Sequence, residues 1–214
     1  MNYMEIIREI SIVAILAYLI GSIPTGYIIV KLFTGQDIRT VGSGSTGATN
    51  VKRVMGKKWF FTVMLLDALK GAIPVLLAIF FAKSLTYDYI IPPVIFNNGI
   101  LPVVAAVCVI LGHSKSVYLE FTGGKSVASG VGTLFALNWI VGLCVAVIWS
   151  VVTWFSKYVS VGSIVALAVA PIIMWLLKTP SAFIVYTVIA AIYVIFLHRE
   201  NIKRLIAGNE NKVR

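Results

Sequence analysis

Long apolar blocks, each about as long as a bilayer is thick, most strongly constrain how this chain folds. The first covers residues 10–32, and similar blocks follow with short polar segments between them. A bilayer core takes roughly 20 apolar residues per helix. Hydrophobic residues make up 59% of the 214 residues and charged ones 12%, whereas soluble domains have about half and a quarter. The pattern predicts an all-α, polytopic integral membrane protein with a single membrane-embedded domain over residues 1–214.

The number of spans depends on one long block. Clear spans are expected at residues 10–32, 59–82, 99–111, 161–177 and 181–197, with a mildly polar turn at residues 83–98 that carries Pro92 and Pro93. Residues 126–155 are also largely apolar. As one helix they would be about 45 Å long at ~1.5 Å per residue, too long for a ~30 Å core without strong tilt. We expect two short helices that turn near Leu137, Asn138 and Trp139, which brings the total to seven.

Lys and Arg residues are distributed unevenly between the two sides of this topology. With the N-terminus outside, the outer side carries Arg8, Lys83 and Lys178, whereas most other basic residues fall in inner loops and the C-terminal tail. An excess of Lys and Arg in cytoplasmic loops is the usual topology signal. We therefore expect the N-terminus outside and the C-terminus in the cytoplasm. The net charge of +10 is then explained without a nucleic-acid partner.

Little points to a metal or a cofactor. Cys108 and Cys144 lie inside apolar blocks, which predicts small buried hydrophobic side chains rather than a disulfide or a metal pair. The first block is too long for the core of a signal peptide, so we interpret it as a span of the mature protein. The polar, glycine-rich segments all fall on the predicted cytoplasmic face, where they can converge on one site.

The strongest candidate for chemistry is the segment V-G-S-G-S-T-G-A-T-N at residues 41–50, followed by Arg53. Glycines allow successive backbone N–H groups to turn toward an anion. Ser43, Thr49 and Asn50 add neutral donors, and the Arg53 guanidinium can bind phosphate oxygens in a bidentate manner. A flexible linker is the alternative, because Gly/Ser composition alone is common in linkers. The tight spacing of the polar residues favours phosphate binding.

A second candidate is Gly123-Gly124-Lys125 at the start of an apolar helix, ten residues after His113. Free N–H groups and an ammonium at a helix start favour an anion there. Lys115, in contrast, is interpreted as a topology marker.

Three further polar groups are more ambiguous. Asp67 and Lys70 lie on one helix face inside a span, where ionisable residues are usually functional; mutual neutralisation as a structural pair is an equal alternative. His198 and Asn201 follow the last span, where a histidine is more often a structural cap than a catalyst. Ser163, in the 156–163 turn, carries the weakest signal.

Taken in order, these motifs resemble one family. The series G-S-G-x-x-G-A-T-N-x-x-R, D-x-x-K-G, G-H-x-x-x-V-Y/F-x-x-F-x-G-G-K-x-V-A and H-R-E-N-I-x-R-L runs from about Tyr18 to the C-terminus. It is similar to the bacterial acyl-phosphate:glycerol-3-phosphate acyltransferases of the PlsY type. The resemblance implies a seven-helix enzyme of the bacterial inner membrane with its active site facing the cytoplasm. It implies transfer of a fatty acyl group from acyl phosphate to the 1-hydroxyl of sn-glycerol 3-phosphate, giving lysophosphatidic acid and phosphate.

The resemblance also assigns expected roles to residues. Catalytic positions are Lys125, Arg53, His198 and Asn201, and substrate-binding positions are Ser43, Thr49, Asn50, Lys70, His113, Gly123, Gly124 and Ser163. Two positions depart from the family pattern: Ser45 stands where Asn is usual, and Ser126 where Gly is usual. We expect little effect from Ser45, whereas Ser126 restricts the backbone beside Lys125 and can alter the pocket slightly.

Acyl phosphate has a good leaving group, so no acyl-enzyme is expected. Cations must hold two phosphates side by side, and we expect a substrate phosphate to take the proton of the 1-hydroxyl. His198 is the alternative base, because an ordinary histidine titrates near the working pH. Expected partners are the two substrates, membrane lipid and an acyl-phosphate-forming enzyme. The rival function is an organic-phosphate transporter, although the polar motifs lie at one face and the halves do not repeat.

Overall fold

The fold, seen in a computed structural model that describes residues 3–88 and 99–213, is helical. The helices are α1 (Tyr3–Ser22), α2 (Thr25–Thr34), α3 (Ala48–Met55), α4 (Lys57–Asp88), α6 (Ile100–Ser114), α7 (Val127–Leu137), α8 (Trp139–Ser156), α9 (Val159–Leu176), α10 (Ser181–Leu197) and α11 (Arg199–Ile206), with short 3₁₀ turns η1 (Ile38–Thr40) and η2 (Val117–Leu119). η1 directly precedes the predicted Gly/Ser segment at residues 41–50, and η2 lies between His113 and Lys125.

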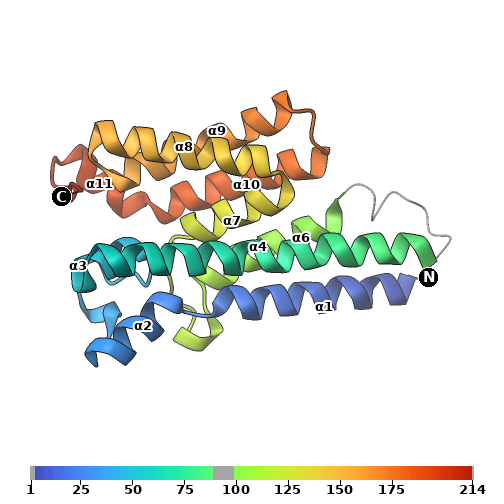
Figure 1. The fold of residues 1–214 in the computed structure, drawn as a ribbon, viewed down its shortest axis with the longest axis horizontal. Coiled ribbons are helices and arrows are strands. Elements are labelled where there is room, and N and C mark those ends of the chain that lie inside the picture. The colour runs from blue at the N-terminus through green and yellow to red at the C-terminus, as the bar shows by residue number, and fades with distance from the viewer. Residues whose placement is uncertain (1–2, 89–98, 214) are drawn as a thin grey trace.

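The long helices form two layers (Figure 1). One layer contains α1, α4 and α6, the other contains α8, α9 and α10, and α7 lies between them. The core joins side chains from both layers, among them Val75, Val109, Leu134 and Leu167. The start of α1 and the tail after α11 lie at opposite ends of the long axis, and α2 and α3 lie at the end near the tail (Figure 1). The polar loops are therefore gathered at one end.

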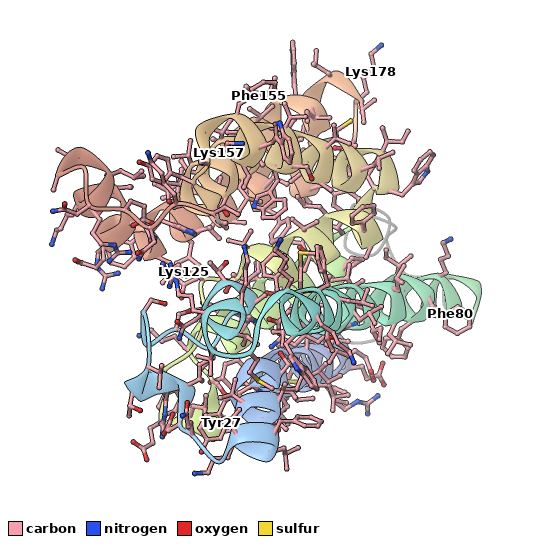
Figure 2. The ribbon with its side chains drawn as sticks, turned by 60° about the vertical axis from the view of Figure 1, so that its left-hand side comes forward. Tyr27, Phe80, Lys125, Phe155, Lys157 and Lys178 are labelled. Carbon is pink, nitrogen blue, oxygen red and sulfur yellow. The ribbon has the colours of Figure 1, made fainter. Side chains whose placement is uncertain are left out.

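Several helices are suited to a membrane. Among the described residues, four helical segments are long and apolar enough to cross one: Met4–Thr34, Lys57–Lys83, Trp139–Ser156 and Val159–Leu176. A fifth is the pair α10 and α11, which is bent by 57°, and α6 and α7 are shorter apolar helices. Phe80 and Phe155 project from the outer surface (Figure 2), with 74% and 78% of their area exposed. Such side chains suit contact with lipid, and the count of seven spans stays a prediction.

The long apolar block is divided as the sequence predicts. α7 ends at Leu137 and α8 begins at Trp139, with Asn138 between them in an extended conformation. The Asn138 side-chain oxygen accepts hydrogen bonds from the backbone N–H groups of Ile140 (3.0 Å) and Val141 (3.3 Å). Asparagine is among the best residues for capping a helix start in this way, so the turn is encoded locally.

Other boundaries differ from the prediction. The first block is not one continuous helix, because α1 ends at Ser22 and α2 begins only after Ile23 and Pro24; proline lacks the N–H that would continue the ladder. α4 extends to Asp88, into the predicted polar turn. The part of that turn containing Pro92 and Pro93 lies outside the described residues. The short helices α3 and α11 were not predicted, since each spans only eight residues.

Close backbone contact fixes the crossing of α1 and α6. A side chain at Gly21 would collide with the backbone of Val109, and one at Gly112 would collide with the backbone of Tyr18 and Ser22. Small residues at such crossings allow helices to pack closely where lipid provides no hydrophobic drive between them. The crossing holds the end of α6, and with it His113, beside the break between α1 and α2.

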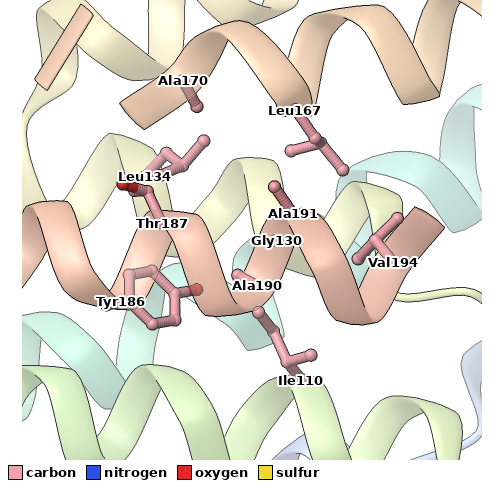
Figure 3. A pocket seen from close by; sticks show the side chains of 10 residues that line it. All are labelled: Ile110, Gly130, Leu134, Leu167, Ala170, Tyr186, Thr187, Ala190, Ala191 and Val194. Carbon is pink, nitrogen blue, oxygen red and sulfur yellow. The ribbon is translucent and has the colours of Figure 1, made fainter. Parts of the chain in front are cut away.

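A small apolar cavity lies where α6, α7, α9 and α10 meet (Figure 3). Ile110, Leu134, Leu167 and Val194 are among its lining residues. Its volume of about 10 Å³ is roughly what one water molecule requires. A fatty acyl chain does not fit there, so an acyl substrate would have to lie elsewhere on the helices.

Candidate active site

The two glycines before Lys125 allow close packing onto α6. The Gly124 N–H donates a hydrogen bond to the His113 carbonyl oxygen (3.1 Å). A side chain at Gly124 would collide with the His113 ring, and one at Gly123 with the His113 carbonyl. The Gly124 N–H is therefore already bonded within the protein and is not a free anion donor as the sequence suggested. The contacts of the two glycines with His113 hold the segment before Lys125 against the end of α6.

Ser126, one of the two departures from the family pattern, caps the start of α7. Its φ of 58° lies in the left-handed region, which costs a non-glycine residue roughly 1–2 kcal/mol. Its buried hydroxyl donates a hydrogen bond to the Ile110 carbonyl oxygen (2.8 Å). This bond offsets part of the strain and ties the start of α7 to α6, so a serine is accommodated where glycine would be easier.

Lys125 lies where the C-terminal helices face the rest of the chain (Figure 2). Its ammonium donates a hydrogen bond to Asn201 Oδ1. Asn201 in turn donates from Nδ2 to Glu210 Oε1 (2.6 Å). Glu210 also accepts from Ser160 Oγ (3.0 Å) and from Arg204 Nε (2.7 Å). The end of the chain thus joins α7, α9 and α11 into one polar cluster, which we call the Lys125 cluster.

Electrostatics make this lysine unusual. The pKa of Lys125 is lowered to about 8, chiefly by burial and also by the positive charges of Arg204 and Arg53, while the charge of Glu210 acts in the opposite direction. Burial alone would raise the pKa of Glu210, but the hydrogen bonds from Asn201, Arg204 and Ser160 outweigh it, so its pKa lies below the usual range. The Lys125 cluster and the nearby Arg53 together present three cationic groups against one carboxylate, which is an environment that favours an added anion.

His198 lies at the junction of α10 and α11 and is only 3% exposed. Its Nδ1 lies 2.8 Å from the Val194 carbonyl oxygen. The pKa of His198 is lowered to about 4, chiefly by burial and also by the charge of Lys125, against the opposing effects of that hydrogen bond and of the Glu210 charge. The expectation that His198 titrates near the working pH is therefore wrong, because it assumed the pKa of an exposed imidazole. At neutral pH the ring is uncharged.

Asn50 organises the Gly/Ser loop from inside. Its Nδ2 donates to the carbonyl oxygens of Val41 (2.9 Å), Ser45 (3.0 Å) and Ile38 (3.3 Å), and its Oδ1 accepts from the Ser43 N–H (3.0 Å). The side chain is 1% exposed. Asn50 was predicted to bind substrate, but these four bonds occupy its amide, so its task in this structure is to shape the loop. The flexible-linker alternative does not fit such a loop.

The remaining residues of the first motif lie nearer to solvent. Ser43 and Arg53 are exposed and Thr49, in the first turn of α3, is half-buried. Within the described residues Arg53 has no hydrogen bond or ion pair to another side chain, so its guanidinium is available to a ligand. A hollow of about 440 Å³ brings the first loop and the glycine pair together; it is lined by Asp37, Arg39, Thr40, Gly44, Thr46, Thr122 and Gly123. The two strongest sequence motifs therefore face one open space.

Lys70 belongs to a different cluster, deeper in the protein. Its ammonium donates to the Ile23 carbonyl oxygen (2.6 Å) and forms an ion pair with Asp67 (2.9 Å). Asp67 also accepts a hydrogen bond from the Thr25 hydroxyl, and His113 Nδ1 lies 3.7 Å from its Oδ1. Ile23 and Thr25 flank the helix break at Pro24. This arrangement, the Lys70 cluster, favours the structural alternative for the Asp67 and Lys70 pair.

Ser163 was predicted at the pocket, but its hydroxyl has partners within the helices. It donates to the Val159 carbonyl oxygen (2.8 Å) and accepts from Trp149 Nε1 (3.2 Å). One helical turn earlier, Ser160 contacts Glu210 instead. The sequence placed Ser160 only within the weakest candidate segment, and it did not indicate Arg204 or Glu210 as site residues. For Glu210 the available signal was a rare acidic residue, one of eight, within a basic tail.

No group of three or more His, Cys, Asp or Glu side chains that could hold a metal ion occurs in the described part of the chain. The chemistry available from these residues is anion binding by Lys125, Arg53 and Arg204, with hydroxyl and amide groups to orient a ligand.

The family follows from sequence comparison. Residues 11–208 match the family described as glycerol-3-phosphate acyltransferase. The chain belongs to this family. A glycerol-3-phosphate acyltransferase from Trichormus variabilis is 45% identical over 94% of this chain and 90% of its own length. One from Clostridioides difficile is 40% identical over 98% of both chains.

Solved structures support the same relationship. The crystal structure of PlsY (YgiH), an integral membrane glycerol 3-phosphate acyltransferase, in its glycerol 3-phosphate form matches with a TM-score of 0.85 at 36% identity, over 96% of both chains. Its lysophosphatidic acid form matches with a TM-score of 0.83 at 34% identity. The sequence-based assignment to the PlsY type is confirmed.

Proposed function

We propose that this acyltransferase moves a fatty acyl group from acyl phosphate to the 1-hydroxyl of sn-glycerol 3-phosphate, giving lysophosphatidic acid and phosphate. The observation that carries the proposal is the similarity, over nearly the whole chain, to a PlsY structure in its glycerol 3-phosphate form. The cation-rich Lys125 cluster supports it, because both substrates and both products carry phosphate groups.

The reaction follows from the chemistry of a mixed anhydride. The 1-hydroxyl oxygen attacks the acyl carbonyl carbon, a C–O bond forms, and the bond from that carbon to the phosphate oxygen breaks. Lys125, with Arg53, would hold the two phosphates together and stabilise the oxyanion and the departing phosphate. Asn201 would fix the direction of the Lys125 ammonium.

The remaining roles divide between binding and support. Ser43 and Thr49 would donate to the acceptor phosphate from the first loop, and Gly123 would border the 440 Å³ hollow beside that loop. His113 and Gly124 would support Lys125, whereas Asn50, Lys70 and Ser163 would shape the loop and helices around the site.

The proton of the 1-hydroxyl would pass to a substrate phosphate. His198 is a poor base, because its pKa of about 4 lies well below neutral pH. We expect His198→Gln to retain more than a tenth of the wild-type kcat at neutral pH. Losses of about 100-fold in both His198→Ala and His198→Gln, with substrate binding intact, would instead make His198 the base.

The proposed setting is the bacterial inner membrane. The domain would cover residues 1–214 and cross seven times, with the N-terminus outside and the active site facing the cytoplasm. The positive charge of the polar loops supports this orientation. The acyl chain would lie against the outer helix faces, and the donor would be supplied by an acyl-phosphate-forming enzyme.

The decisive experiment measures phosphate release by purified protein with synthetic acyl phosphate and glycerol 3-phosphate. Release that requires both substrates, with lysophosphatidic acid as the second product, supports the acyltransferase. An inactive wild type that exchanges glycerol 3-phosphate across vesicle membranes would favour the transporter.

A further inference from the structure

Glu210 is a buried carboxylate outside the ordered sequence motifs. Its side chain is 5% exposed. Both oxygens have partners: Oε1 accepts from Ser160 and Asn201, and Oε2 accepts from Arg204. These partners come from α9 and α11, so one side chain connects two helices beside Lys125.

The bond to Asn201 decides which way that amide faces. Asn201 has one acceptor and one donor end, and Glu210, an acceptor, can bond only the NH₂ end. The oxygen end is therefore turned toward the Lys125 ammonium. With the amide reversed, two donors would face each other and two acceptors would face each other. Glu210 thus acts on Lys125 through Asn201, because it fixes which end of the amide faces the ammonium.

The tail that carries Glu210 is held in place independently. The chain reverses at Gly208, whose φ of 71° is left-handed, and the Asn209 N–H donates to the Arg204 carbonyl oxygen (2.8 Å). Farther on, the Val213 N–H donates to the Lys157 carbonyl oxygen (2.7 Å) in the turn between α8 and α9. Residues on both sides of Glu210 are therefore held by backbone hydrogen bonds, which fix the position of the Glu210 side chain.

A carboxylate near a phosphate site normally repels the ligand. Here the charge of Glu210 is compensated at 2.7 Å by Arg204, while Lys125 is directed to the neutral oxygen of Asn201. The remaining ammonium hydrogens of Lys125 and the exposed guanidinium of Arg53 stay available to an added anion.

We propose that Glu210 is a positioning residue for acyl transfer, holding Asn201 and Arg204 so that Lys125 presents its ammonium to the substrate phosphates. The proposal rests on the acyltransferase function proposed above. It assigns the tail after α11 a part in catalysis that the ordered motifs, which end before it, do not indicate.

The test uses full-length protein in the phosphate-release assay, with Glu210→Ala, Glu210→Gln and Glu210→Asp beside wild type. Glu200→Ala is the matched control, since Glu200 lies on α11 and, within the described residues, forms exposed ion pairs with Arg199 and Lys203. We expect kcat/KM to fall about tenfold or more in Glu210→Ala, because the donor geometry at Lys125 is lost. Glu210→Asp should recover part of this loss, and Glu200→Ala should match wild type.

The pH dependence of kcat/KM distinguishes a positioning role of Glu210 from a loss of activity through destabilisation of the fold. Lys125 faces Arg53 from α3, Arg204 from α11, Glu210 from the tail and His198 from the end of α10. Glu210 supplies the negative charge in this set, so Glu210→Gln should move the alkaline fall of kcat/KM to lower pH. A variant that only loosened the fold would lose activity without that shift.

The outcomes test the proposed function and the positioning role of Glu210 separately. An inactive wild type refutes the proposed function itself. Active wild type with unchanged kcat/KM and pH profile in Glu210→Gln and Glu210→Ala overturns the positioning role. A lower KM for glycerol 3-phosphate in Glu210→Ala also overturns it, because Glu210 would then be blocking the anion site. If Glu210→Ala fails to fold, the Gln and Asp variants give the same decision.

Discussion

Two lysines of this protein, Lys70 and Lys125, differ in their burial and in the groups that surround them. Lys70 is 7% exposed and is bonded to the Ile23 carbonyl and the Asp67 carboxylate. Lys125 is half-buried, and its ammonium donates a hydrogen bond to the neutral oxygen of Asn201. The first lysine has its charge neutralised inside the fold, and the second does not.

The difference shows how one residue type serves two tasks. In the Lys70 cluster, polar groups satisfy the backbone carbonyl left open at the α1–α2 break, which must be bonded in a region without water. In the Lys125 cluster, cations outnumber the single carboxylate, so an anionic substrate is needed to balance them. We therefore expect changes in the first to affect stability and changes in the second to affect activity.

The largest expected effect is on activity, at Lys125. Lys125→Ala should reduce phosphate release about 1,000-fold, because it removes the main charge that stabilises the departing phosphate. Lys115→Ala is the control, since Lys115 is exposed and was interpreted as a topology marker. Equal activity in Lys125→Ala and wild type would remove the central residue of the proposed site.

The next effect is on stability, at Lys70. Lys70→Met should lower the stability by about 3 kcal/mol, because it leaves the Asp67 charge buried without its partner. Thermal unfolding in detergent measures this, and Asp67→Asn combined with Lys70→Met should recover part of the loss. If Lys70→Met instead keeps its melting temperature and loses activity, the two clusters do not differ as we describe.

The comparison also predicts a pH dependence. The pKa of Lys125 is lowered to about 8, so the ammonium loses its proton as the pH rises through that value. We expect kcat/KM to fall above about pH 8, approaching tenfold for each further pH unit. Lys125→Arg, although less active, should show no such fall because a guanidinium keeps its proton. A flat profile in wild type to pH 10 would contradict this interpretation.

The smallest expected effect concerns Ser126, which joins α7 to α6 beside Lys125. Ser126→Ala should destabilise by about 1 kcal/mol, because it removes the hydrogen bond to Ile110 and keeps the left-handed conformation. Ser126→Gly loses the same bond but relieves the strain, so its melting temperature should lie above that of Ser126→Ala. The reverse order would show that the backbone at this position is not strained.

Much of the fold could be predicted from short stretches of the sequence. The apolar blocks located the long helices, and Asn138 marked the division of residues 126–155 because its side chain caps the next helix. The end of the first helix was not predicted, since Pro24 occurs inside an apolar block and proline inside a membrane helix is often tolerated. α3 and α11 were missed because eight residues are too few for periodicity to stand out.

The site divides in the same way. Lys125, Arg53 and Asn201 were selected from motifs, and the structure places Lys125 beside Asn201 and within electrostatic reach of Arg53. Asn50 and Ser163 were selected too, but their side chains are bonded within the fold. Which face of a helix a polar residue presents depends on its packing partners, and a motif does not contain that information.

The sequence by itself determined that this chain is a helical membrane protein of the glycerol-3-phosphate acyltransferase family, because block length and motif order are properties of the chain. The tertiary structure decided which polar residues meet. Glu210 joins Ser160 across 50 positions, and Lys125 meets Asn201 across 76. Contacts between residues so far apart in the sequence form only when the helices pack. They distinguish Lys70, which stabilises the fold, from Lys125, which is proposed to bind substrate.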